Sequence, residues 1–174
     1  YADPKYNWMY TAEPDPALHH RSLYWPRGKV LGGSSSINAM VYIRGHRQDY
    51  EDWRAAGNVG WGWDEVLATY RKIEDYAAGD PDLRGRGGPL TITDLGSQAH
   101  PLCKPDLEAA EKAGLPFTPD FNGKSQEGAG LYQFTIKNGI RNSAARTFLH
   151  PAMKRKNLLV ETHAQVTKIL FEGK

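Results

Sequence analysis

The chain has 174 residues, with 22 lysines and arginines against 20 aspartates and glutamates, so its formal net charge is only +2. Such a balance gives no electrostatic reason to expect a nucleic-acid or acidic partner. Hydrophobic residues make up 40% of the sequence, which is enough for a folded core. No apolar run approaches the roughly 20 residues that cross a bilayer. We therefore expect a folded protein that binds no nucleic acid and has no transmembrane segment.

The cysteine and histidine content argues against metal binding. Cys103 is the single cysteine, which excludes an internal disulfide and any zinc site made of several cysteines. His100 and Cys103 form one isolated His-x-x-Cys pair with no matching second pair. We expect no metal site, and we expect a structural or solvent-exposed role for each histidine.

The first half of the chain combines irregular segments with one clear helix. Dense prolines and aromatic residues favour an extended segment over 1–26. The apolar run 37–43 could begin as a short helix capped by a serine. Apolar residues at helical spacing predict a helix over 63–76, with Asp64 as its N-cap. A short strand is expected at 90–93.

The second half is richer in strand signals. Alternation of apolar and polar residues predicts a half-buried strand, and the Asn138-Gly139 pair directly after it predicts a tight turn. Helices and strands alternate without a regular βαβ series, which favours an α+β or incomplete α/β fold. The elements expected in this half are a helix over 101–113 ended by Gly114, a strand over 132–137, a helix from Asn142 or Ser143 through 149, and strands over 158–162 and 165–171.

The strongest candidate for a ligand site is the Gly/Ser loop at 32–36, which reads Gly-Gly-Ser-Ser-Ser. Glycines let the backbone approach a ligand closely, and successive N–H and hydroxyl groups can surround an anion such as a nucleotide pyrophosphate. The loop is neither a Walker motif nor a G-x-G-x-x-G fingerprint. From these five residues alone, a plain Gly/Ser connector is the more economical interpretation.

A longer stretch changes that interpretation. The run from Trp25 to Trp53, with Gly-Gly-Ser-Ser-Ser-Ile-Asn-Ala-Met-Val-Tyr-Ile-Arg-Gly at its centre, resembles the first signature of the glucose–methanol–choline (GMC) flavoprotein oxidoreductases. Segments 7–14, 120–123 and 141–149 are similar to other landmarks of that family, and so is the end of the chain. The resemblance covers essentially the whole chain and lies nearest to the choline dehydrogenase-like and aliphatic alcohol dehydrogenase branch.

The resemblance implies an incomplete α+β fold that represents the middle segment of a larger enzyme. Part of a GMC-type FAD-binding α/β domain and part of a substrate-binding domain are expected, without the family's N-terminal βαβ unit and C-terminal catalytic region. The catalytic histidine is therefore expected outside this chain. The implied divisions are an FAD-domain segment with the flavin-contacting loop at 1–50, a helical intermediate region at 51–89, part of the substrate-binding domain at 90–154, and strands returning to the FAD domain at 155–174.

The resemblance also implies a cofactor, FAD, held without a covalent bond. Ile37 stands where some relatives carry a histidine joined to the flavin, and isoleucine cannot form that bond. The Gly/Ser loop would approach the pyrophosphate, the segment 38–41 would pass the reactive edge of the flavin ring, and Val166 would touch the adenine end. The FAD-binding residues that we expect are Val30, Gly32, Gly33, Ser34, Asn38, Ala39, Met40, Val41 and Val166.

The implied activity is oxidation of a primary alcohol, either an aliphatic alcohol or choline, by hydride transfer to flavin N5. Electrons would pass to an acceptor other than oxygen. The alternatives are an oxygen-using oxidase or a non-redox member of the same family, and a non-catalytic subunit or fragment that folds only against a companion chain. The expected partners are a small alcohol and the remaining segments of the same enzyme, in one polypeptide or two. The expected location is the cytoplasm, with a peripheral position at the inner membrane as the alternative.

Overall fold

The computed structural model describes residues 2–173. Helices and short strands are mixed along the chain, as the α+β expectation required. The helices are α1 (Arg47–Ala55), α2 (Trp63–Ile73), α3 (Cys103–Lys112) and α4 (His150–Ala152). The strands are β1 (Tyr10–Thr11), β2 (Tyr24–Trp25), β3 (Glu74–Asp75), β4 (Leu90–Thr91), β5 (Thr93–Asp94), β6 (Gln133–Phe134), β7 (Ile136–Lys137) and β8 (Ile140–Arg141).

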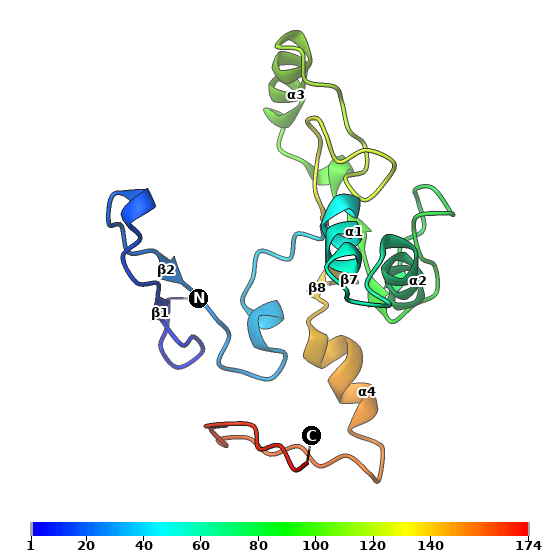
Figure 1. Ribbon diagram of the computed structural model, residues 1–174. Helices are drawn as coiled ribbons and strands as arrows, with labels where there is room; N and C mark the ends of the chain where they lie inside the picture. The colour runs from blue at the N-terminus through cyan, green and yellow to red at the C-terminus, as the bar shows by residue number, and fades with distance from the viewer. Residues whose placement is uncertain (1, 174) are drawn as a thin grey trace.

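The strands pair two by two, so within the described residues no extended sheet organises the chain. β1–β2, β5–β6 and β7–β8 are antiparallel pairs, whereas β3 and β4 are parallel. Figure 1 shows the blue β1–β2 arm at the left, apart from a region that contains α1 and α2, with α3 at the top of the view above α1. Contacts between loops therefore hold the segments of the chain together more than sheet hydrogen bonds do.

The core is small and unusually polar. The buried hydrophobic residues of the described chain are Tyr50, Tyr76, Ile92 and Ala145. The side chains that are most completely buried are polar or charged, whereas large apolar residues such as Phe171 remain 87% exposed. An isolated domain usually has the opposite distribution. Much of the apolar surface of this chain is therefore uncovered.

Helices α1 and α2 pack around Tyr50. Its ring contacts Trp53 at 5.6 Å and Trp63 at 5.8 Å between centroids. Its hydroxyl lies 2.8 Å from the hydroxyl of Tyr70, which comes from α2. His46 forms the N-cap of α1, because its Nδ1 accepts from the backbone N–H two residues later. This gives one histidine the structural role that was expected.

The helix expected over 63–76 is confirmed, but its two ends differ from the expectation. Gly62 occupies the N-cap, and Asp64 lies inside the first turn, where its charge favours the helix dipole without capping a backbone group. The helix stops at Ile73 because Glu74 and Asp75 leave as β3 to pair with β4. Tertiary pairing thus overrides local helix propensity at this end.

The turn and the strands around residue 138 test the strand signals. Asn138 and Gly139 have φ angles of 52° and 73°, and they join β7 to β8, so the predicted tight turn is confirmed. The single strand expected over 132–137 is divided into β6 and β7, which pair with β5 and β8 respectively. After β8, a π-helical turn over Ala145–Leu149 continues into α4.

Other expectations were wrong in detail. The helix expected to begin at 37–43 is absent, and a 3-10 turn over Gly33–Ser36 precedes this extended segment instead. α3 ends at Lys112, and Gly114 follows with a φ of 91°, as a helix stop requires. The strands expected over 158–162 and 165–171 are not formed in the described residues. Within the described residues neither segment forms the hydrogen-bond ladder that would define a strand.

Candidate functional site

The Gly/Ser loop depends on glycines where the backbone doubles back. A Cβ atom on Gly28 would lie 2.1 Å from the carbonyl oxygen of Gly33, so only glycine fits at this crossing. Gly32 and Gly33 have positive φ angles of 87° and 55°. Apart from its chain neighbours, nothing lies within 4 Å of the position that a Gly33 Cβ would take. The loop therefore presents backbone to open space at this point.

The serine hydroxyls mainly shape this loop. Ser35 Oγ donates to the carbonyl of Gly32 at 2.6 Å and accepts from the N–H of Ala144 at 2.9 Å. Ser36 Oγ donates to another loop carbonyl at 2.8 Å, and Ser34 Oγ accepts from a backbone N–H at 3.2 Å. The hydroxyl hydrogens of Ser35 and Ser36 are thus used within the protein, whereas the Ser34 hydroxyl only accepts in its bond. The expected role of the loop in surrounding an anion stays a prediction.

The first of two clefts beside the loop has a volume of about 600 Å³. It contains three of the expected FAD-binding residues, and it also contains Ile37, which the family resemblance places where some relatives are expected to carry a flavin-linked histidine. The Ile37 side chain is a hydrocarbon without a nucleophilic atom. The residues that line this cleft are Pro26, Arg27, Ser34, Ile37, Asn38 and Ala39.

The second cleft has a volume of about 670 Å³ and lies between residues 28–31 and 161–165. Val30 is part of its lining. Val166 directly follows this lining and is 74% exposed. Segments about 130 positions apart in the sequence thus share one cleft. Gly32 and Gly33 lie on the chain between the residues that line the two clefts.

Met40 and Val41 have a different environment, because they are paired with the last residue of β6 and the residue that follows it. The carbonyl of Met40 accepts from the N–H of Thr135 at 2.8 Å, and Val41 forms an antiparallel bridge with Phe134. Met40 has a φ of 64°, in the left-handed region that few non-glycine residues adopt. Neither residue lines the two clefts, so their expected contacts with FAD stay a prediction.

Both clefts carry basic side chains. Arg27, in the first cleft, stacks on Trp25 with its guanidinium carbon 4.8 Å from the ring centroid. In the second cleft, Lys29 Nζ lies 4.8 Å from the ring centroid of Trp8, and Lys5 is also part of the lining. Cations in both of these clefts suit a ligand whose negative charge lies near the loop.

The segment that leaves the first cleft is held by residues from a distant part of the chain. Asn122 accepts from the N–H of Arg44 at 2.8 Å and donates to the carbonyl of Tyr42 at 3.0 Å. Gln126 donates to the carbonyl of Arg44, also at 3.0 Å. The N–H of Tyr42 donates to the carbonyl of Gln133 at 2.9 Å. These bonds fix the backbone of residues 42–44 on both of its edges.

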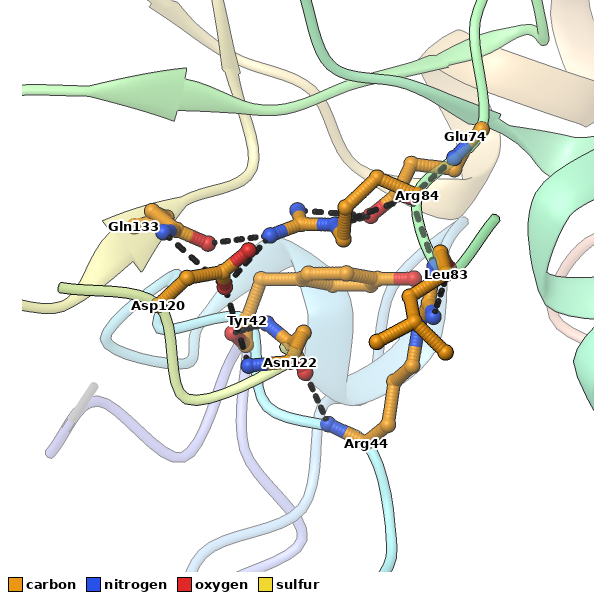
Figure 2. A network of polar contacts seen from close by, with 9 residues as sticks. Tyr42, Arg44, Glu74, Leu83, Arg84, Asp120, Asn122 and Gln133 are labelled. Atoms are coloured by element: carbon orange, nitrogen blue, oxygen red, sulfur yellow. Dashed lines mark hydrogen bonds and ion pairs between the residues drawn. The ribbon is translucent and has the colours of Figure 1, made fainter. Parts of the chain in front are cut away.

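A buried ionic network lies behind this segment (Figure 2). Glu74 accepts from Arg44 at 2.6 Å and from Arg84 at 2.8 Å, and all three side chains are at most 1% exposed. Arg84 also donates to Asp120 at 2.6 Å and to Gln133 at 2.9 Å. Two cations are thus balanced by two carboxylates, which offsets the cost of removing these charges from water.

Three groups in or beside this network, Arg84, Tyr42 and Tyr76, have a raised pKa. Burial alone would lower the pKa of Arg84, but the hydrogen bonds and charges of Glu74 and Asp120 outweigh it and raise that pKa. Burial raises the pKa of the Tyr42 and Tyr76 hydroxyls. Arg84, Tyr42 and Tyr76 therefore keep their protons at neutral pH.

Sequence reasoning missed this network and also missed Arg141, which contacts the loop. Arg84 and Gln133 are 49 positions apart, and Arg141 bonds to Asn38 over 103 positions. No spacing pattern links residues at such distances. Arg44, Asp120 and Arg141 carried a signal only as members of segments that resemble GMC proteins, and that signal did not show that they meet.

Two searches of the described chain complete the description of the site. No group of three or more histidine, cysteine, aspartate or glutamate side chains within residues 2–173 could hold a metal ion. Over the same residues, every helix is too short or too polar to cross a membrane.

Comparison with known proteins identifies the class. A family model described as GMC oxidoreductase matches residues 15–174. The chain therefore belongs to the GMC oxidoreductase family, which confirms the resemblance seen in the signature. This family consists of FAD-dependent oxidoreductases, so the glycine loop and its basic clefts occur in a flavoprotein family.

Two relatives illustrate how similar the chain is to known enzymes. It is 48% identical over 171 residues to the mitochondrial choline dehydrogenase of Mus musculus, covering 98% of this chain and 28% of that protein. It is also 48% identical over 171 residues to an alcohol dehydrogenase [acceptor] of Pseudomonas putida, covering 98% of this chain and 31% of that protein. The chain thus spans less than a third of the length of these relatives.

Two solved structures have the same fold over nearly the whole chain. The pyridoxine 4-oxidase from Mesorbium loti matches with a TM-score of 0.87 at 36% identity, covering 97% of this chain and 33% of that one. An FAD-dependent oxidoreductase from Chaetomium thermophilum matches with a TM-score of 0.84 at 31% identity, covering 99% and 32%. The described fold therefore corresponds to about a third of larger GMC proteins.

Proposed function

We propose that these residues belong to an FAD-dependent enzyme that oxidises a primary alcohol and passes the electrons to an acceptor other than oxygen. The observation that carries the proposal is the glycine loop, which lies on the chain between the residues that line two clefts with basic side chains. A dinucleotide has two ends joined by a pyrophosphate, and this arrangement offers a cleft for each end and a close backbone approach between them. FAD would supply the hydride acceptor, N5 of its ring.

The chain's own residues bind and orient in this proposal. Gly33 leaves room for the pyrophosphate, because no side chain occupies the space in front of it. Asn38 and Ala39 line the first cleft, where the flavin ring would lie, and Val30 lines the second, on the adenine side with Val166. The base that takes the alcohol proton is assigned to a histidine outside this chain.

FAD is proposed to be dissociable. Ile37 lines the first cleft and offers only carbon atoms, so it cannot form the histidine–flavin bond expected of some relatives. Acid precipitation of the full-length protein should therefore release all of its flavin into the supernatant. The Ile37→Val variant provides the control, since it keeps a hydrocarbon at this position and should release flavin in the same way.

The proposed partners are an alcohol and the remaining segments of the same enzyme, in one polypeptide or two. Large apolar side chains near the end of the described chain support the second partner, because Leu159, Ile169 and Phe171 are 80%, 76% and 87% exposed. Covering them would bury apolar area that is now in water. We also propose the four divisions given above, bounded at 50, 89 and 154, and a cytoplasmic location with the inner-membrane surface as the alternative.

Particular relatives support two substrates, choline and an aliphatic alcohol, and two electron acceptors, oxygen and an acceptor other than oxygen. The choline dehydrogenase and the alcohol dehydrogenase [acceptor] are equally similar to this chain, at 48% identity, so both choline and an aliphatic alcohol are candidates. The fold match to pyridoxine 4-oxidase supports an oxygen-using oxidase as the second candidate function.

One experiment separates these candidates. Full-length protein reconstituted with FAD is mixed anaerobically with choline, with a short-chain primary alcohol, or with a secondary alcohol as the control. The proposal predicts that choline or the primary alcohol bleaches the visible flavin absorbance and that a dye acceptor restores it faster than air does. Faster recovery with air would favour the oxidase. A protein that stays oxidised with every alcohol would contradict the proposed activity.

A further inference from the structure

The side chain of Asn38 is held in one orientation by two donors. Its amide oxygen Oδ1 accepts from the backbone N–H of Met40 at 3.0 Å and from Arg141 Nη1 at 2.9 Å. An amide oxygen only accepts, and an amide nitrogen only donates. A flipped side chain would place its NH₂ group against both donors, so the hydrogen-bond pattern itself assigns the orientation.

Arg141 makes these contacts from β8, beyond the tight turn at 138–139. The same Nη1 atom also donates to the carbonyl of Asn38 at 2.8 Å and to the carbonyl of Ser35 at 3.2 Å. Within residues 2–173 Arg141 forms no ion pair. Its positive charge is therefore not neutralised by a carboxylate of the described chain, and it lies directly behind the loop.

The other end of the Asn38 amide is available. Asn38 is exposed and lines the first cleft, and no group of residues 2–173 accepts a hydrogen bond from its Nδ2. The next residues hold the backbone in place, because Met40 adopts its left-handed conformation while Thr135 binds its carbonyl. A strained conformation held by neighbours on both sides is typical of a site prepared in advance for a ligand.

We propose that Arg141 is a positioning residue for the flavin. By binding Oδ1 it turns the Nδ2 group of Asn38 into the first cleft, where this group donates to a hydrogen-bond acceptor on the edge of the flavin ring. The inference rests on the proposed function, because it requires FAD in that cleft. It assigns to a hairpin about 100 residues downstream of the loop the task of orienting a cofactor contact.

The test compares four variants of the full-length protein by FAD affinity and by the visible spectrum of the bound flavin. Arg141→Met should weaken FAD binding about three- to tenfold, since an unpinned amide has to be ordered on binding. It should also shift the flavin spectrum, as Asn38→Ala should. Arg146→Met is the matched control, because this nearby arginine is exposed and its side chain forms no hydrogen bond or ion pair within the described chain. Arg141→Lys keeps a cationic donor and should recover most of the loss.

A double-mutant cycle decides whether Arg141 acts through Asn38. Adding Arg141→Met to Asn38→Ala should weaken FAD binding no further. The proposal would be overturned if Arg141→Met weakened FAD binding as much in the Asn38→Ala protein as in the unmutated one. It would also be overturned if Arg141→Met bound FAD like the Arg146→Met control. If Arg141→Met does not fold, Asn38→Asp replaces it, since this exposed, isosteric change keeps Oδ1 and removes the donor. Tight FAD binding by Asn38→Asp would then refute the inference. Failure of the unmutated protein to bind FAD would instead refute the proposed function.

Discussion

Replacing Arg84 by methionine tests the buried ionic network. Methionine fills much of the volume of the arginine side chain but removes its charge and all of its donors. Arg84 is completely buried and donates to both oxygens of Glu74, to Asp120 and to Gln133. The variant therefore leaves two carboxylates without their shared cation. We expect a large loss of stability with little change in packing.

The magnitude follows from what each carboxylate keeps. Removing one partner of a buried ion pair costs about 3–5 kcal/mol. Glu74 retains Arg44 at 2.6 Å and the N–H of Gly85 at 2.7 Å, and Asp120 retains the N–H of Asn122 at 2.9 Å. These remaining bonds place the expected loss near the lower end, at about 3 kcal/mol.

Urea unfolding of the full-length protein, followed by tryptophan fluorescence, measures this loss. Lys124→Met is the matched control, because Lys124 lies 3.6 Å from Asp80 with its side chain 85% exposed. Such a surface pair contributes at most about 1 kcal/mol. If Arg84→Met destabilised the protein no more than Lys124→Met, the network would not hold the fold as we describe.

Three further predictions concern the loop, the helix pair and the hairpin. Gly28→Ala places a Cβ atom 2.1 Å from a backbone oxygen, and it should weaken FAD binding about tenfold or more in a fluorescence titration; unchanged affinity would contradict the crossing. Burial and the hydrogen bond to Tyr50 raise the pKa of Tyr70 above 10.0. The folded state thus keeps this proton when the unfolded state loses it, so the stabilisation is present below pH 10.0 and is lost at higher pH. Tyr70→Phe should therefore show a shallower alkaline loss of stability, and an identical pH profile would refute this linkage. Gly139→Ala meets no neighbour but must keep a φ of 73°. It should cost about 1 kcal/mol in urea unfolding, and a neutral or stabilising effect would contradict the strained turn.

The parts of the fold that depend on neighbouring residues could be predicted from the sequence. The turn at Asn138-Gly139 is an example, because its positive φ angles follow from the residues themselves. Helix α2 was also predictable from its apolar spacing, but its end at Ile73 was not. That end depends on Glu74, which enters a strand pair and the ionic network.

The segments at 158–171 show the opposite case, in which the sequence predicts strands that the structure does not form. Their β-rich composition predicts strands, yet a strand forms only where a partner completes its hydrogen bonds. Within residues 2–173 no other segment pairs with them. Residues 158–171 have a composition suited to strand pairing, and Phe171 is exposed. Both features agree with a surface that other segments of the enzyme would cover.

The candidate site also contains some features that could be predicted from the sequence and others that could not. The loop from Gly32 to Ser34 was predictable because glycine and serine have local conformational effects and because its signature is specific. The contribution of Arg141 was not, since its three contacts with the loop arise only when β8 folds back onto residues 35–38. Contacts at this sequence separation need the tertiary structure.

The central claim is that the loop and its two clefts hold FAD in a member of the GMC family. The most direct measurement is the visible absorption spectrum of the full-length protein after incubation with FAD and desalting, with Gly28→Ala treated in parallel. We expect a bound-flavin spectrum for the unmutated protein and a much weaker one for the variant. Equal flavin in both proteins, or none in the unmutated protein, would contradict the account.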